Sequence, residues 1–125
     1  MTHIILTDDE KALRELLALQ LESMGYVVHP ASDGAEALAL YAKHPGAVVV
    51  LDMIMPGMEG METILAFSRL HPKARIIAIS GGGRISGVSL LKVASQLGAR
   101  ATLAKPFHPD DLHQTIQKVL EAPSP

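Results

Sequence analysis

The sequence predicts an α/β domain built as a (βα)5 doubly wound parallel sheet. Short apolar runs with β-branched residues alternate with longer stretches of helical period, which is typical of parallel β/α units. Runs such as Val48 to Leu51 and Ile76 to Ile79 are apolar at every position, as strands covered on both faces must be. Right-handed crossovers between such strands place helices on both sides of the sheet.

The strands are predicted from these apolar runs and the turn residues that bound them. In chain order they are His3 to Asp8, Tyr26 to His29, Ala47 to Asp52, Arg75 to Ser80 and Arg100 to Ala104.

Each predicted helix carries an apolar stripe expected to face the sheet. The stripes are Leu13, Leu16, Leu17, Leu21 and Met24; Ala35, Leu38, Tyr41 and Ala42; Met61, Ile64 and Leu65; Leu90, Leu91, Ala94 and Leu97; and Leu112, Ile116, Val119 and Leu120.

Capping residues mark the helix ends. We expect Asp9 to cap the first helix, and Ser32 or Asp33 to cap the second. Gly25 suits the end of the first helix, and Pro109 suits the first turn of the last one.

The composition fits one domain over residues 1–121, followed by a frayed tail at 122–125. Eleven Lys and Arg against thirteen Asp and Glu give a net charge of -2, and only two Phe and two Tyr supply aromatic rings, so we expect no direct nucleic-acid binding. Without cysteine there are no disulfides. No apolar stretch approaches the roughly 18 residues of a membrane span, and the expected location is the cytoplasm.

Polar residues end four of the predicted strands: Asp8 with Asp9, Asp52, Ser80 and Lys105. In open α/β sheets the carboxyl ends of the strands form the ligand site, so we expect these side chains to converge. Three neighbouring carboxylates repel one another by about 1 kcal/mol per pair in water and by about 4 kcal/mol at an effective dielectric constant of 20. A hard divalent cation, Mg²⁺, is expected to offset this repulsion.

Such a site suits phosphoryl transfer. A carboxylate can act as the nucleophile and become an aspartyl phosphate, and Asp52 is placed for that role. Lys105 would pair with the phosphoryl group, and the Ser80 hydroxyl would bond one of its oxygens. Taken alone, Asp8 and Asp9 are better explained as helix N-caps than as metal ligands. Ser80 taken alone is equally well explained as a turn residue.

The chain resembles the receiver domain of bacterial two-component response regulators over essentially its whole length. The resemblance rests on the acidic pair in ILTDDE, the acceptor segment LDMIMPGMEG, the hydroxyl ending IIAIS, and AKPF before the last helix. It implies a flavodoxin-like strand order 2-1-3-4-5, and an Asp52 that accepts a phosphoryl group from a histidine kinase or histidine phosphotransfer protein.

The resemblance also implies roles for the surrounding residues. Asp8 and Asp9, one of them through water, would bind Mg²⁺ together with Asp52 and the backbone carbonyl of Ile54. Ser80 and Lys105 would sense the phosphorylated state, and the peptide bond from Lys105 to Pro106 would be cis. The domain would assist only its own phosphorylation and dephosphorylation.

The sequence departs from the family pattern in three places. Thr102 stands where an aromatic residue commonly moves inward on phosphorylation. The glycine-rich segment 81–87 lengthens the stretch before Lys105. We expect this segment, in place of an aromatic ring, to move on phosphorylation. Such a movement would change the amide exchange of residues 81–87. Ile54 and Gly82 replace polar residues that influence phosphate lifetime, which predicts slow self-hydrolysis.

The message would leave by contact with a downstream protein of unknown identity, through the fourth helix, fifth strand and fifth helix. The chain would be a monomer or a weak phosphorylation-dependent dimer. It is alternatively a receiver from a longer regulator or hybrid kinase. A Mg²⁺-dependent phosphohydrolase is disfavoured because Ile54 occupies the position of its second catalytic Asp, and a flavin or nucleotide binder is disfavoured by the acidic loop TDDEKA.

Methionines and histidines allow two further interpretations. Met53, Met55, Met58 and Met61 fit core packing better than a binding surface. The six histidines lack the sequence spacing of zinc ligands, and His44 and His71 are expected at helix C-termini.

Overall fold

The computed structural model describes residues 1–54, 59–81, 84–85 and 88–121. Its elements are β1 (His3–Thr7), α1 (Lys11–Ser23), β2 (Val27–Ala31), α2 (Gly34–Lys43), β3 (Val48–Asp52), α3 (Glu59–Leu70), β4 (Arg75–Ser80), β5 (Arg84–Ile85), β6 (Val88–Ser89), α4 (Leu90–Gln96), β7 (Ala101–Ala104) and α5 (Pro109–Glu121).

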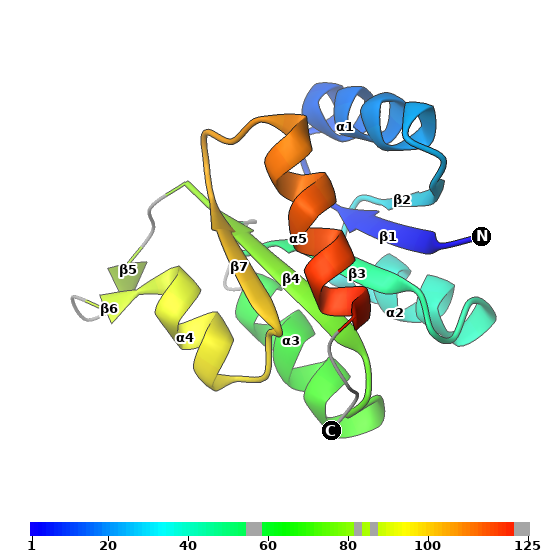
Figure 1. The fold of residues 1–125 in the computed structure, drawn as a ribbon. Helices are drawn as coiled ribbons and strands as arrows, with labels where there is room; N and C mark the ends of the chain where they lie inside the picture. The colour runs from blue at the N-terminus through cyan, green and yellow to red at the C-terminus, as the bar shows by residue number, and fades with distance from the viewer. Residues whose placement is uncertain (55–58, 82–83, 86–87, 122–125) are drawn as a thin grey trace.

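Five parallel strands form the main sheet in the order β2-β1-β3-β4-β7 (Figure 1). Counted along the main sheet this is the order 2-1-3-4-5, which confirms the predicted doubly wound (βα)5 fold. Strand β3 lies at the centre, and all five of its residues are buried. It therefore delivers its last residue, Asp52, to the middle of the carboxyl edge of the sheet.

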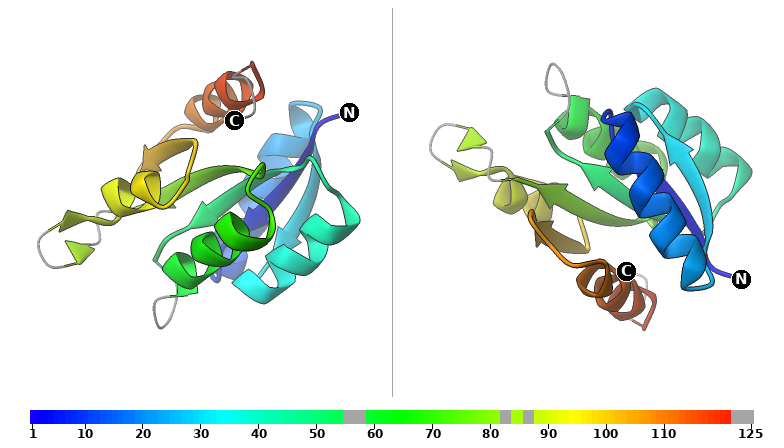
Figure 2. Two further views of the ribbon diagram at one scale, coloured as in Figure 1. Left: turned by 90° about the horizontal axis from the view of Figure 1, so that it is seen from below. Right: turned by 90° about the horizontal axis from the view of Figure 1, so that it is seen from above.

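The sheet lies between two helical layers (Figure 2). One core cluster joins α1 and α5 to the sheet, with Leu21 and Ile116 among its buried members. The other joins α2, α3 and α4 to the opposite face, around the fully buried Ile64 and Phe67. Burial of these two apolar faces is the main stabilising contribution to the fold.

Several residues expected to face the sheet do not. Leu16 and Leu65 are 52% and 42% exposed, and Ala35 and Ala42 are also exposed. In each of these helices, the face that contacts the sheet is narrower than the apolar stripe in the sequence. A residue about 100° around the helix from the middle of that face already points sideways, toward solvent.

The caps are only partly as expected. Asp33 caps α2, since its carboxylate accepts a hydrogen bond of 2.8 Å from the Glu36 N–H. The expectation for Asp9 is wrong: Glu10 is the N-cap of α1 and makes no side-chain capping bond. The Asp8 carboxylate instead accepts a hydrogen bond of 2.9 Å from the Glu10 N–H, so Asp8 stabilises the turn that leads into α1.

The segment between β4 and α4 contains a short antiparallel pair, β5 and β6, which the sequence pattern did not predict. Gly82 lies outside the described residues, as do Met55 and Met58 and the predicted tail 122–125. Met53 is buried, in agreement with a packing role. Among the residues described, no helix has the length and apolarity to cross a membrane.

Candidate functional site

Asp52 is buried at the end of the central strand. It is 5% exposed, and its two carboxylate oxygens have different partners. One accepts a hydrogen bond from the Ile54 N–H at 2.9 Å, and the other accepts from the Lys105 ammonium at 3.1 Å. These two contacts fix the orientation of the carboxylate at the edge of the sheet.

Asp8 and Asp9 follow β1, the neighbouring strand, so the sheet order brings them to Asp52. Asp8 is 3% exposed, while Asp9 is exposed to solvent. The Asp8 N–H donates to the Ala31 carbonyl at 3.1 Å, which ties this turn to the end of β2. Asp8, Asp9 and Asp52 each offer a carboxylate oxygen within 4.8 Å of the others, so the predicted acidic cluster forms.

Lys105 and Ser80 complete the edge. The Lys105 N–H donates to the Ser80 carbonyl at 2.8 Å, which extends the pairing of β7 with β4 by one bond. The Lys105 ammonium lies 3.6 Å from Asp8 as well as 3.1 Å from Asp52. Ser80 is 1% exposed at the end of β4. The peptide bond between Lys105 and Pro106 is cis, as the resemblance implied.

Burial and neighbouring charges act in opposite directions on the pKa values of Asp52 and Lys105. Burial raises the pKa of Asp52; the Ile54 N–H and Lys105 oppose the rise, and the charge of Asp8 adds to it. Burial alone would lower the pKa of Lys105, but its hydrogen bond with Asp52 and the charges of Asp52 and Asp8 outweigh this and raise it. One ammonium therefore balances only part of the charge of three carboxylates.

The donor set fits a hard divalent cation. All three side chains offer oxygen atoms, which Mg²⁺ prefers, and the exposed side of Asp9 leaves room for the waters that Mg²⁺ retains. A cation held there would neutralise the charge that Lys105 leaves unbalanced. It would also leave positions at which an oxyanion could bind next to Asp52.

Two residues that support the site were not predicted. The Arg14 guanidinium donates to the Asp8 carbonyl at 2.7 Å and holds the turn before α1. Gly60 packs against the backbone of Met53, the residue after Asp52: a Cβ at Gly60 would lie 2.6 Å from the Met53 carbonyl oxygen. No local spacing signals the role of Arg14, because its partner is the backbone carbonyl of Asp8 and not a side chain. Gly60 gives no signal in the sequence either, because its contact is set by tertiary packing.

Comparison with known proteins finds a matching family and similar proteins. Residues 4–117 match the family described as the response regulator receiver domain. The chain is 33% identical over 123 residues to the transcriptional regulatory protein GlrR of Escherichia coli (strain K12), and the match covers 98% of this chain but only 27% of GlrR. The chain thus spans about a quarter of that relative's length.

Other similar proteins are close to the chain in length. The sporulation initiation phosphotransferase F of Bacillus subtilis (strain 168) is 30% identical over 117 residues, covering 94% of this chain and 92% of the relative. A crystal structure of a CheY-like response regulator receiver domain protein from Methanospirillum hungatei JF-1 superposes with a TM-score of 0.84 at 29% identity. That match covers 97% of this chain and 94% of the other.

Proposed function

The chain belongs to the response regulator receiver domain family, and from this premise we propose that Asp52 is its phosphoacceptor. The observation that carries the proposal is the position of the Asp52 carboxylate, at the end of the central strand and 3.1 Å from the Lys105 ammonium. The carboxylates of Asp8 and Asp9 offer oxygen atoms within 4.8 Å of it and of each other.

The proposed donor is a phosphohistidine on a sensor histidine kinase or a histidine phosphotransfer protein. An Asp52 carboxylate oxygen attacks the phosphorus atom, forming an O–P bond as the N–P bond of the phosphohistidine breaks. The bonding electron pair stays on the donor imidazole, which takes up a proton from solvent. The receiver thus acts as a signalling domain that assists its own phosphorylation and dephosphorylation.

Asp8, Asp9, Asp52 and the Ile54 carbonyl are the proposed Mg²⁺ ligands. Bound Mg²⁺ would neutralise the charge that develops on the transferred phosphoryl oxygens. Lys105, already 3.1 Å from Asp52, would exchange this partner for a phosphoryl oxygen. The buried Ser80 hydroxyl would bond a second oxygen, so both residues would respond to the phosphorylated state.

A groove next to the site suits the approach of the donor. It lies between α1 and the start of α5, has a volume of about 520 Å³, and is lined by Leu13, Leu16, Gln20, Lys105 and Phe107 among others. Leu16 lines it and is 52% exposed. Because the groove includes Lys105, a helix of the donor bound there would carry its phosphohistidine to the edge that holds Asp52.

The output would leave through another face of the domain. The exposed Thr102 on β7 replaces the usual aromatic residue, so the signal is expected to travel through α4, β7 and α5 without a ring movement. The proposed recipient is a downstream protein, with the receiver acting in the cytoplasm as a monomer or as a weak phosphorylation-dependent dimer.

Intact mass spectrometry tests the proposal directly. The protein is incubated with Mg²⁺ and a small phosphodonor such as phosphoramidate, and the same is done with Asp52→Asn and with Asp110→Asn, a surface control on α5. We expect the mass of one phosphoryl group on the wild type and the control only. A phosphorylated Asp52→Asn variant would assign the acceptor elsewhere, and release of phosphate over many turnovers would indicate a phosphohydrolase.

A further inference from the structure

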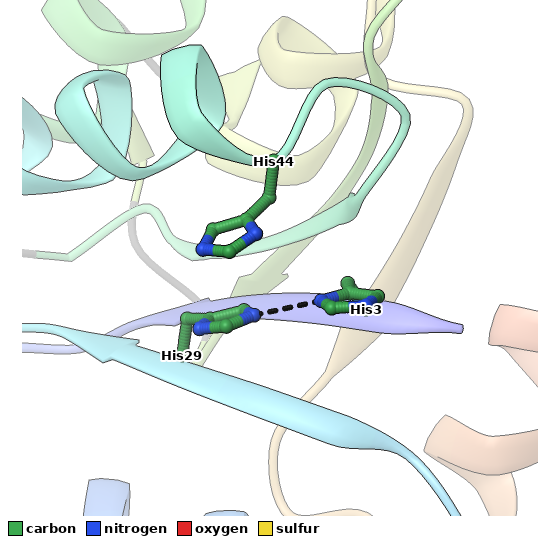
Figure 3. Close-up of side chains that lie close together, drawn as sticks. All are labelled: His3, His29 and His44. Carbon is green, nitrogen blue, oxygen red and sulfur yellow. Dashed lines mark hydrogen bonds between the residues drawn. The ribbon is translucent and has the colours of Figure 1, made fainter. Parts of the chain in front are cut away.

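Three histidines from separate elements meet near the amino end of the sheet, away from the acidic cluster. His3 begins β1, His29 lies in the edge strand β2, and His44 is the C-cap of α2. Each ring offers a nitrogen within 4.8 Å of the others, and all three side chains are partly buried (Figure 3).

The backbone explains why they meet. His3 pairs with Val27 and Ile5 with His29, so His3 and His29 lie two positions apart on the same face of adjacent strands. That face is the one covered by α2. After α2, Gly46 adopts a positive φ of 96°, and the Ala47 N–H donates to the His44 carbonyl at 3.1 Å, which fixes the turn that places the His44 ring over His29.

The ring geometry is close to what a metal ion needs. His3 Nδ1 and His29 Nε2 share a hydrogen bond of 2.9 Å, which a bound ion would replace. Two nitrogens bound to one tetrahedral Zn²⁺ are about 3.3 Å apart, given Zn–N bonds of about 2.0–2.1 Å. His44 stacks on His29 with ring centroids 3.9 Å apart. Rotation of the His44 side chain would turn a ring nitrogen toward the same point.

Access to the cluster is open. A hollow of about 460 Å³ adjoins it and is lined by His3, His44, Pro45 and Gly46 among others.

We propose that His3, His29 and His44 form a binding site for one divalent transition-metal ion, with Zn²⁺ as the expected ion and water as its fourth ligand. Three imidazoles suit Zn²⁺, Cu²⁺ or Ni²⁺ and do not suit Mg²⁺, which prefers oxygen. The site is about 16 Å from Asp8 along β1, at roughly 3.3 Å per residue. The domain would therefore hold two sites with different ion preferences.

An ion bound there would join the start of β1, the middle of β2 and the end of α2. The edge strand β2 has a hydrogen-bonded neighbour on one side only, so this link would hold it to the sheet. Binding to the folded state alone stabilises it, and at 100 times the Kd we expect the Tm to rise by about 5 °C or more.

Calorimetric titration of tag-free, metal-stripped protein with Zn²⁺ tests the proposal, with excess Mg²⁺ present to occupy the acidic site. We expect one ion per chain in the wild type. The single variants His3→Gln, His29→Gln and His44→Gln should each weaken Zn²⁺ binding by at least about 100-fold. This exceeds the effect of removing a residue that only hydrogen-bonds to a metal ligand, which is about 10- to 100-fold. His108→Gln, another histidine before a proline but 70% exposed, should bind as the wild type does.

Co²⁺ gives a second readout. Bound to three nitrogens and one water it should show the intense visible absorption of a four-coordinate ion, and the spectrum should be retained in Asp52→Asn. The proposal is overturned if the three histidine variants bind like the wild type, if Asp52→Asn abolishes binding, or if Co²⁺ stays six-coordinate. If a variant fails to fold, the shifts of the His3, His29 and His44 ring signals in the wild-type NMR spectrum on adding Zn²⁺ decide instead.

Discussion

Asp52 and Lys105 are 53 positions apart in the sequence, yet the Lys105 ammonium donates a 3.1 Å hydrogen bond to the Asp52 carboxylate. The same ammonium lies 3.6 Å from Asp8. Lysine therefore links the two buried acids of the cluster, one from each of two adjacent strands. Any event that adds charge to Asp52 must also change what Lys105 contacts.

The ionisation of Asp52 should oppose folding. Its pKa is raised from the ordinary 3.8, first by burial, so its neutral form is favoured in the folded state. The corresponding contribution to stability is present below pH 3.8 and is lost as the pH rises through the folded pKa. Without Mg²⁺, we expect Asp52→Asn to increase the free energy of unfolding at pH 7 by about 1 kcal/mol.

Urea unfolding of both proteins from pH 3 to pH 8 measures this effect. The difference between them should disappear as the pH falls below 3.8. Asp110→Asn is the matched control, because its carboxylate is 69% exposed. An equal gain in that control, or a gain in Asp52→Asn that does not depend on pH, would contradict the assignment to burial.

Mg²⁺ binding should offset the loss of stability that the charge of Asp52 causes. We expect Mg²⁺ at 100 times its Kd to raise the free energy of unfolding of the wild type by about 2.7 kcal/mol. Asp9→Asn should weaken Mg²⁺ binding by at least about 10-fold with little effect on the metal-free protein, since Asp9 is exposed. Thermal unfolding with and without Mg²⁺ checks this, and unchanged Mg²⁺ dependence in Asp9→Asn would remove Asp9 from the ligands.

Phosphorylated Asp52 should hydrolyse slowly. Ile54 is 47% exposed beside the site and carries no acid or amide to orient water. We expect a half-life well above seconds, and Ile54→Gln should shorten it by about 10-fold, less than an optimally placed general base provides. Mass spectrometry at successive times measures how fast the wild type and the Ile54→Gln variant lose the phosphoryl group. Leu65→Gln, at an exposed position on α3, should leave the lifetime unchanged.

Gly60 should tolerate no side chain. A Cβ there would lie 2.6 Å from the Met53 carbonyl oxygen. The Met53 backbone could move away only at a large cost in free energy. We expect Gly60→Ala to lower the free energy of unfolding by about 1–3 kcal/mol, although alanine favours helices by about 1 kcal/mol over glycine. Glu62→Ala, exposed on the same helix, is the control for urea unfolding. A stabilised Gly60→Ala protein would show that this close approach does not constrain the turn after Asp52.

The groove between α1 and α5 should matter only for a protein donor. We expect Leu16→Ser to slow phosphoryl transfer from an autophosphorylated histidine kinase by about 10-fold, the effect of losing roughly 1.5 kcal/mol of apolar burial. Phosphorylation by phosphoramidate should stay the same. Leu70→Ser, 62% exposed at the end of α3, is the control. Equal slowing with both donors would indicate damage to the site.

Much of the candidate site could be predicted because strand ends are a local property of the sequence. The run Val48 to Leu51 is apolar throughout, so Asp52 had to emerge at its end. The helix faces were harder to predict. Leu16 and Leu17 are equally apolar, and only contact with the sheet distinguishes the exposed residue from the buried one.

The amino-acid order alone determined the fold class, the strand ends and the acids that follow them, because apolar runs and their periods depend on near neighbours. Tertiary structure decided which distant side chains share a pocket. Nothing in the spacing of His3, His29 and His44 indicated that their rings would meet, since that depends on the register of β1 with β2 and on the turn that ends α2. Convergence of this kind follows from long-range packing, which local patterns do not encode.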